Sequence, residues 1–357
     1  MDRFTIKGLW WKCLSFILIL YSIIAGLIVP LRSGITSVQP DHVQAGEDVS
    51  LQVKGYNSHF DGSDASFRAL LKLDDDHAIE MDTFEVLSRQ DLRIQFSIPG
   101  SSPYDSQVLP LTLVLYNTED GSSVLPNAVF ISNNKKSIGD RHGWGDTSVL
   151  QGLSGESKMR FPFRNILVET IRNTYFHVPL WLAMMVILFL SMTKSIGYLR
   201  YGARSSDSSA VSYAATGLLF GILGIVTGSL WAKNTWGAYW SFDVKQNTAA
   251  IALLIYAAYF ILRQSIPDKD LARRVSAGYN IFAFIPLIPL LYIIPRMTAS
   301  LHPGSGGNPA MGGEDLDNTM RLVFYPAVIG WILLGIWISS LWSRYLNVRE
   351  YIQEADN

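Results

Sequence analysis

Six stretches of this chain contain no Asp, Glu, Lys or Arg, and they constrain its fold more than any other feature. They cover residues 13–31, 178–193, 208–232, 246–262, 275–295 and 322–343. About 20 apolar residues in an α-helix cross a hydrocarbon layer roughly 30 Å thick with every backbone group hydrogen-bonded inside the helix. Only 17% of the residues are charged, against about 25% in an average soluble domain. The sequence therefore predicts an all-α polytopic membrane protein with six transmembrane helices.

Two of these stretches are open to a second interpretation. Residues 178–193 are few for a membrane span, and we expect the segment 175–177 to complete this helix at the interface. Residues 13–31 follow a basic segment and are also compatible with a secretory signal peptide. Their length and the lack of a small-residue cleavage site favour a membrane anchor.

The cationic residues predict the orientation, because Lys and Arg accumulate in short cytoplasmic loops. With the amino terminus inside, twelve Lys and Arg residues near the spans are cytoplasmic and four lie in short outer loops. The four are Lys233, Lys245, Arg296 and Arg321. We therefore expect a multi-pass membrane protein with both termini cytoplasmic.

The segment between the first two spans differs in character from the rest of the chain. Residues 31–160 contain 18 acidic and 11 basic residues. Apolar and polar residues alternate between turn residues, as in VSLQVKGY, LRIQFSI and LPLTLVLYN. This pattern predicts an extracytoplasmic β-sandwich insert, and its first strands resemble those of bacterial immunoglobulin-like domains.

The expected domain organisation has five parts. These are a transmembrane helix at 1–30, the β-sandwich insert at 31–132, a Gly- and Ser-rich mobile linker at 133–160, a membrane domain with five further helices at 161–345, and a cytoplasmic tail at 346–357.

Several site types are excluded by the residues themselves. Cys13 is the single cysteine, so the chain has no disulfide, no C-x-x-C redox pair and no C-x-x-C-H haem-attachment site. The segment GGNPAMGGEDLDN fits neither a P-loop nor an EF-hand. We expect the lipid bilayer, and no nucleic acid, as a partner.

Two of the six histidines stand apart from the others. His42, His59, His77 and His142 fall in the insert or its linker, where ordinary polar surface residues are expected. His177 and His302 lie where an outer loop meets the membrane, on the same side by the predicted topology. A single interfacial histidine is more often a hydrogen-bonded structural residue than a ligand. As a pair, the two could flank one haem iron.

An aromatic loop separates these two histidines. Trp231, Trp236, Tyr239, Trp240 and Phe242 fall within twelve residues. Aromatic faces can stack on a flat ligand such as a porphyrin, with Asp243 orienting or capping the loop. The alternative is an interfacial belt, because Trp and Tyr gather at membrane surfaces without any ligand.

Three segments resemble motifs of the haem-handling proteins of cytochrome c assembly, the family of CcmC, CcmF and CcsA. WGAYWSFD is similar to the tryptophan-rich WGxxWxWD signature, while YFHVPLW and TASLHPG resemble the two external histidine segments of CcmC. The motifs occur in the family order, and the resemblance covers residues 1–30 and about 161–345. Phe242, Asn247 and Pro303 depart from the usual Trp, Thr and Gln.

This resemblance implies a haem b site at the outer face. It makes His177 and His302 the axial ligands, which are also the metal-binding residues, and Trp236, Trp240 and Asp243 the platform. We add Trp231 to the platform, and Arg296 and Arg321 as partners for the haem propionates.

The resemblance to CcmC further implies presentation of haem to a chaperone similar to CcmE. The expected partners include a small CcmD-like subunit and a CcmA/CcmB-like transporter. CcmF and CcsA carry further histidines within the membrane, which this chain lacks in its predicted spans. We therefore expect haem delivery or assembly, with the covalent chemistry left to partners.

Other functions remain open from the residues alone. They are a b-type membrane cytochrome in electron transfer, a CcsA-like subunit of a cytochrome c synthase, a solute transporter, and a scaffold whose insert is the working part. Transporters generally need polar or broken helices near the membrane midplane, which is the reason to rank that class low.

Overall fold

The computed structural model describes residues 8–62, 66–132, 143–145, 159–165, 167–302 and 316–355. The chain forms two compact units. The membrane unit comprises Met1–Val29 with Glu169–Asn357, and the insert comprises Pro30–Val168. Each unit is described by itself below.

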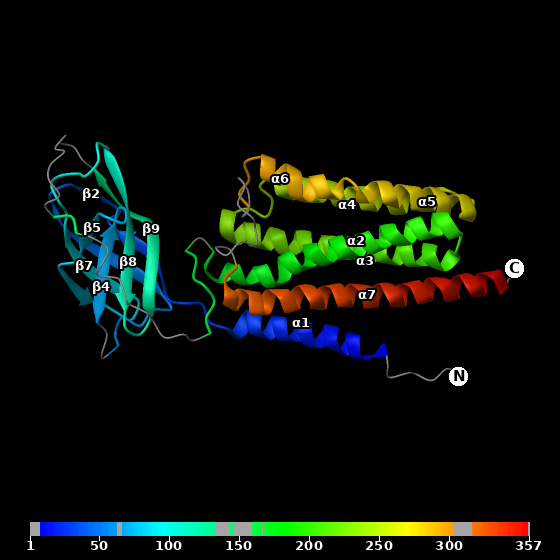
Figure 1. Cartoon of the computed structure of the whole chain (residues 1–357), viewed down its shortest axis with the longest axis horizontal. Helices are drawn as coiled ribbons and strands as arrows, with labels where there is room; N and C mark the ends of the chain where they lie inside the picture. The colour runs from blue at the N-terminus through cyan, green and yellow to red at the C-terminus, as the bar shows by residue number, and fades with distance from the viewer. Residues whose placement is uncertain are drawn as a thin grey trace. The chain divides into compact units, whose positions relative to one another are not determined.

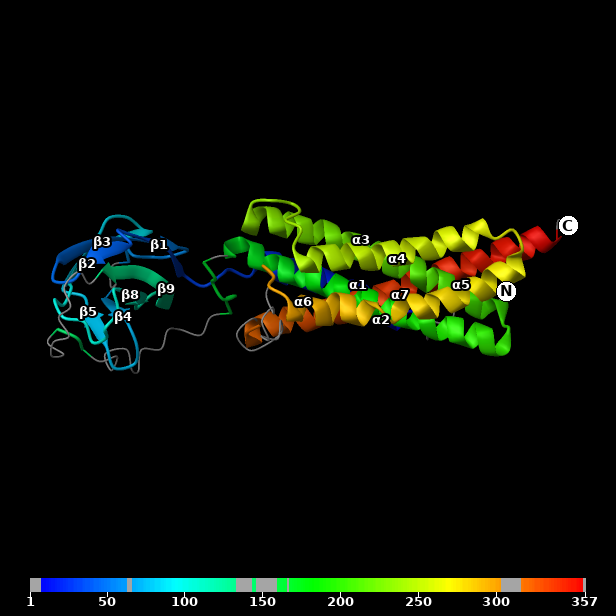
Figure 2. The same cartoon turned by 90° about the horizontal axis from the view of Figure 1, so that it is seen from above.

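The membrane unit is a bundle of long helices running side by side (Figures 1 and 2). Its elements are α1 (Trp10–Ile28), the 3-10 helix η3 (Val168–Asn173), α2 (Thr174–Tyr201), α3 (Arg204–Trp236), α4 (Val244–Ser265), α5 (Lys269–Phe284), the π-helix η4 (Pro289–Ile293), α6 (Ile294–Met297) and α7 (Asn318–Ala355). Six helical segments of the described chain are long and apolar enough to cross a membrane. The six expected membrane helices are confirmed.

The helices α2, α3, α4 and α5 alternate in direction, and short turns join them (Figure 1). Gly202 ends α2 in the left-handed conformation, with φ of 68°, which a glycine adopts without steric cost, and α3 begins two residues later. Consequently α2 and α4 begin, and α3 and α6 finish, at one end of the bundle. We call this the histidine end.

Prolines interrupt the fifth span, which runs over Lys269–Met297. Pro286, Pro289 and Pro295 each lack a backbone N–H, so the α-helical hydrogen-bond ladder cannot continue unchanged. A π-helical turn forms here, directly before α6. The fifth span also extends beyond the uncharged stretch 275–295 at both ends.

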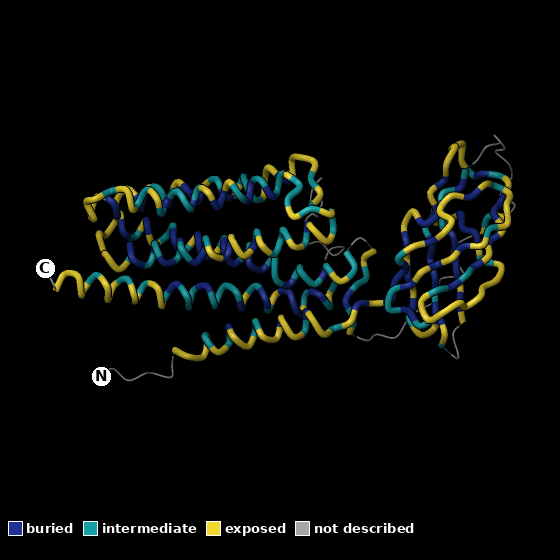
Figure 3. Tube along the Cα trace, turned by 180° about the vertical axis from the view of Figure 1, so that it is seen from behind, coloured by how far each residue is buried: buried dark blue, intermediate teal, exposed yellow. Residues whose placement is uncertain are grey.

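A row of glycines on α3 receives side chains of neighbouring helices. A Cβ atom added at any of the four would lie less than 3 Å from a side-chain atom. Such small residues let helices approach closely where no hydrophobic driving force separates protein from lipid. The pairs are Gly217 with Leu188, Gly221 with Leu253 and Met184, Gly224 with Trp181, and Gly228 with His177. Buried residues accordingly face the inside of the bundle, whereas α1 is mostly exposed (Figure 3).

A cluster of ion pairs joins four helices at the end opposite the histidine end. Asp207 of α3 is buried and accepts two hydrogen bonds, at 2.9 and 2.5 Å, from Arg263 of α4. Arg273 of α5 lies 3.7 Å from the same carboxylate and also pairs with Glu350 of α7. Pairing is what allows these charges to be buried, because an unpaired buried charge is strongly destabilising.

The D207N substitution tests this cluster. It leaves two arginines next to a neutral amide, so we expect the free energy of unfolding to fall by about 3 kcal/mol. The exposed pair between Arg204 and Glu354 offers a matched control, and R204Q should stay within error of the wild type. Denaturant unfolding in mild detergent measures both, and equal effects of the two substitutions would contradict this account.

The insert consists of two β-sheets. Their strands are β1 (Gly34–Gln39), β2 (His42–Gln44), β3 (Asp48–Tyr56), β4 (Phe67–Lys72), β5 (Ala78–Glu80), β6 (Thr83–Val86), β7 (Asp91–Ser97), β8 (Val108–Asn117) and β9 (Gly121–Ser132). The four-stranded sheet has the order β1-β3-β7-β6 and the five-stranded sheet β2-β9-β8-β4-β5. The second sheet is mixed, because β2 runs parallel to β9 while its other pairs are antiparallel. The sheet-rich insert is confirmed, and its immunoglobulin-like character stays a prediction.

The alternation seen in the sequence fills one core from both sheets. Leu51 and Val53 of β3 and Ile94 of β7 pack in the same cluster as Leu113 of β8 and Val129 of β9. Alternate residues of β3 between these positions are exposed. The period of two along a strand therefore separates a buried face from a solvent face.

The two ends of the insert meet beside each other. The backbone N–H of Arg32 donates to the carbonyl of Phe161 at 2.7 Å, and that of Phe161 donates to the carbonyl of Pro30 at 2.9 Å. The insert thus leaves the membrane unit and returns to it through paired segments. Most of the expected mobile linker, 133–160, lies outside the described residues.

The insert histidines are held by neighbouring carboxylates. His42 is exposed beside Asp41, and His59 lies 3.0 Å from Asp120. His77 is buried, which corrects the expectation of an ordinary surface residue. Its burial arises from a turn in which its ring contacts Asp74. His142 lies outside the described residues.

Asp74 gives the insert a pH-dependent contact. Burial alone would raise the pKa of its carboxyl, but hydrogen bonds from the Tyr104 hydroxyl, the Asp76 backbone and His77 outweigh it and lower the pKa to about 2. A depressed carboxyl pKa contributes stability that is present above the ordinary value of 3.8 and is lost as the pH falls towards 2.

Pepsin digestion between pH 4 and pH 2 measures that contribution. At pH 4 we expect the wild type to resist cleavage in β4 and β5 better than D74N does. The ratio of the two cleavage rates should approach one near pH 2, and taking the ratio removes the pH dependence of the protease. A ratio that stays constant over this range would rule out Asp74 as the titrating group.

Candidate functional site

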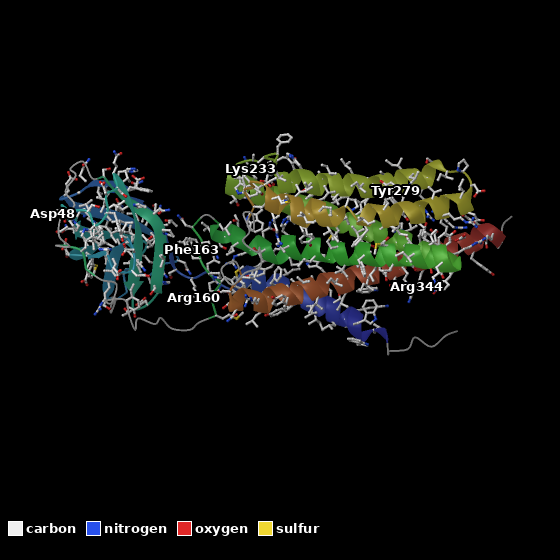
Figure 4. All side chains as sticks on the ribbon, turned by 45° about the horizontal axis from the view of Figure 1, so that its top comes forward. Asp48, Arg160, Phe163, Lys233, Tyr279 and Arg344 are labelled. Atoms are coloured by element: carbon white, nitrogen blue, oxygen red, sulfur yellow. The ribbon has the colours of Figure 1, made fainter. Side chains whose placement is uncertain are left out.

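Both singled-out histidines lie at the histidine end of the membrane unit. His177 is in the first turn of α2, and His302 follows α6 by five residues. In Figure 4, Lys233 near the end of α3 marks this region, whereas Arg344 lies far along α7. Both histidines contact the last part of α3, His177 through Trp231 and His302 through Trp236.

His302 is oriented by a carboxylate. Its Nδ1 lies 2.8 Å from Oδ1 of Asp243, whose side chain is only 3% exposed. A carboxylate at neutral pH can only accept a hydrogen bond, so Nδ1 carries the proton and donates it. The other ring nitrogen, Nε2, is then the one with a lone pair for a metal.

The surroundings of His302 keep its ring neutral. Burial lowers the pKa of His302, the charge of Lys245 lowers it further, and Asp243 acts in the opposite direction. The edge of the Trp236 ring system meets the imidazole with centroids 4.7 Å apart. A neutral imidazole held between a carboxylate and an indole is in the form that binds metals.

Asp243 joins two loops that are distant in sequence. It is the N-cap residue of α4, where its side chain accepts from the backbone N–H of Lys245 at 2.9 Å. It also accepts from the Ser300 hydroxyl at 3.0 Å and the Leu301 backbone at 2.9 Å. Burial alone would raise the pKa of this carboxyl, but the hydrogen bonds and the charge of His302 lower it. The group is therefore an anion at neutral pH.

His177 is oriented by the backbone of α3. Its Nδ1 lies 3.0 Å from the carbonyl oxygen of Gly224 and 3.2 Å from the hydroxyl of Thr227. A carbonyl only accepts, so Nδ1 again carries the proton and Nε2 the lone pair. The indoles of Trp181 and Trp231 meet the imidazole edge-on, with centroids at 6.3 and 5.9 Å. The two histidines therefore share one protonation pattern.

The aromatic loop between α3 and α4 is held in place by polar contacts. Gly237 ends α3 with a φ of 82°, and its carbonyl accepts from the Lys233 ammonium at 2.9 Å. The Gln246 amide oxygen accepts from the Ser241 backbone at 2.9 Å. Phe242 has a positive φ of 57°, which is uncommon for a bulky residue and indicates a constrained loop.

The ordered loop leaves aromatic surface open to solvent or ligand. Tyr239 is 57% exposed and Phe242 is 78% exposed. Large exposed aromatic side chains in the loop that precedes Asp243 are suited to a flat apolar ligand. This is the chemical character of the site as a whole.

The structure brings some of the predicted site residues into contact with the two histidines. Trp231 contacts His177, and Trp236 and Asp243 contact His302. Trp231 and Trp236 belong to α3 and not to the expected outer loop, whereas Trp240 lies in that loop and is partly buried. Arg296 is exposed, and Arg321, at the start of α7, donates to the Asn318 side chain at 3.2 Å.

Sequence analysis singled out Asp243 but missed other residues that position the two histidines. Trp181 could have been found, because it follows His177 by four positions and therefore shares its helix face. Gly224 and Gly228 could have been found from the repeated small residues of α3. Ser300 carried no signal, since only the folded loop brings it to Asp243.

Known proteins resemble the membrane unit. A family model described as CcmC, heme exporter protein C, matches residues 163–356. Heme exporter protein C of Bradyrhizobium diazoefficiens is 29% identical over 168 residues, which is 47% of this chain and 63% of that protein. Its Escherichia coli K12 counterpart is 25% identical over 180 residues, 50% of this chain and 71% of that protein. Cytochrome c biogenesis protein CcsA of Pelargonium hortorum is 36% identical over 80 residues, 22% of this chain and 25% of that protein.

The G228A substitution tests the packing of the His177 ring against α3. A Cβ atom there would lie 2.6 Å from the imidazole Cε1, so the ring must move away from the Gly224 carbonyl. Nitrogen NMR of protein labelled only at histidine should show a shifted His177 ring signal. G278A is the matched control, because a Cβ atom at Gly278 meets nothing within 4 Å. An unshifted His177 signal in G228A would contradict the close packing.

Proposed function

The chain belongs to the haem exporter protein C (CcmC) family, and we propose that it binds haem b at its histidine end and acts in cytochrome c maturation. The observation that carries the proposal is the shared orientation of His177 and His302. Each donates Nδ1–H to a fixed acceptor, which points the lone pair of Nε2 away from that acceptor. Metal-binding histidines are commonly fixed in this way.

The donor set suits haem better than a bare metal ion. Among the residues that the structure describes, no group of three or more His, Cys, Asp and Glu is arranged to hold a metal ion. Two imidazoles complete the coordination of an iron that already has four porphyrin nitrogens. A macrocycle also gives the exposed faces of Tyr239 and Phe242 a flat partner.

Each proposed site residue then has a distinct role. His177 and His302 bind the iron through Nε2. Trp231 and Trp236 support the two imidazoles from their edges, as their ring contacts favour. Trp240 and Asp243 complete the platform. Arg296 and Arg321 pair with the propionates at the rim, where a guanidinium forms strong hydrogen bonds to a carboxylate.

We further infer that the chain presents its haem to a partner. When bound, haem supplies an iron centre and a reactive porphyrin edge, and two imidazole ligands leave no iron position for a substrate. The protein residues therefore hold and orient the group, which suits transfer to a haem chaperone of the CcmE type. A CcmD-like subunit and a CcmA/CcmB-like transporter are the proposed further partners.

The proposed topology follows from the charges and the family. Both termini lie in the cytoplasm, and the histidine end and the insert lie on the periplasmic side of the inner membrane. The insert is proposed to be an immunoglobulin-like sandwich. Two sheets that share one apolar core support this, and the parallel β2–β9 pair is its departure from a purely antiparallel sandwich.

Absorption spectra of the purified protein with added haem test the function. The wild type should give a low-spin spectrum with two nitrogen ligands, and H177A and H302A should each lose it. Substituting a residue that hydrogen-bonds to a metal ligand weakens metal binding by about 10- to 100-fold, so loss of a ligand itself should weaken haem binding at least as much. H42A, on the exposed surface of the insert, is the matched control and should behave as the wild type.

Two results of these spectra would contradict the proposal. One is a wild type that stays haem-free when haem is added. The other is haem binding that survives both substitutions unchanged. Transfer of haem from the loaded protein to a CcmE-like acceptor, compared with reduction of that haem by a quinol, then distinguishes delivery from electron transfer.

A further inference from the structure

We propose that Asp243 makes His302 a stronger iron ligand than His177 and thereby favours the ferric state of haem at this site. The inference rests on the proposed function, because it concerns the iron that the two histidines would share. It assigns to Asp243 a positioning and tuning role that the platform role does not include.

The two histidines have unequal hydrogen-bond partners. Nδ1–H of His302 donates to a carboxylate at 2.8 Å, whereas Nδ1–H of His177 faces a neutral carbonyl at 3.0 Å and a hydroxyl at 3.2 Å. Hydrogen bonds to an ionised acceptor are shorter and roughly twice as strong as those between neutral groups. Only one of the two imidazoles is therefore polarised by a full negative charge.

A negative acceptor on Nδ1 changes the opposite nitrogen. It draws the proton away from the ring, which increases the electron density that Nε2 donates to a metal. Ferric haem carries one more positive charge than ferrous haem, so it gains more from the stronger donor and from the nearby anion. One electron separates the two states, and no bond to the histidines needs to break.

The carboxylate is held in the position that this role requires. Asp243 is buried, and the backbone of Lys245, the hydroxyl of Ser300 and the backbone of Leu301 all donate to it. These donors fix both oxygens, so the anion cannot turn away from His302. Helix capping alone explains the contact to Lys245 and leaves the other contacts unexplained.

Spectroelectrochemical titration of haem-loaded protein measures the effect. We expect D243N to shift the ratio of ferric to ferrous haem at a fixed potential about tenfold towards ferrous, which corresponds to a rise of about 59 mV for one electron. Asn remains a good N-cap residue, so α4 should keep its start. T227V is the matched control: it removes the hydroxyl from His177 without changing charge, and it should shift the potential much less.

The outcomes separate this inference from the proposed function. A wild type that takes up no haem overturns both. Haem-loaded D243N with the wild-type potential, or a T227V shift as large as that of D243N, overturns the role of Asp243 alone. If D243N retains no haem, D243E decides, because it restores the charge: a potential near that of the wild type supports the inference, and a raised potential overturns it.

Discussion

The apolar layer that the six helices cross dictates where this chain can place its polar chemistry. Charged side chains in such a layer are costly unless they are paired, so they collect at the two ends of the bundle. At one end Asp207, Arg263, Arg273 and Glu350 satisfy one another. At the histidine end Asp243 accepts a hydrogen bond from Nδ1 of His302 and so orients that ring. The first cluster holds helices together, and the second orients a histidine.

Close packing between α2 and α3 gives the site its rigidity. His177 is fixed because α3 offers a carbonyl at Gly224 and the space of a missing side chain at Gly228. His302 is fixed by a loop whose contacts converge on one carboxylate. One histidine thus depends on helix packing and the other on loop hydrogen bonds.

The sequence predicts the helices of this fold well because hydropathy reports directly on the membrane. It places His177 and His302 at the same end because alternating spans fix the side of each loop. It does not reveal the bond between Asp243 and His302, since 59 residues separate them and only tertiary structure brings them together. The sequence also did not predict the burial of His77, because this burial depends on a local turn around Asp74. The π-helical turn in the fifth span also arises from packing around prolines whose positions alone do not specify it.

We propose that His177 and His302 share one haem iron, and a cryo-electron microscopy map of the haem-loaded protein would show whether they do. We expect a single porphyrin at the histidine end, with Nε2 of both residues within bonding distance of the iron and the ring covered by the aromatic loop. A porphyrin bound through only one of these histidines, or located elsewhere on the membrane unit, would contradict it.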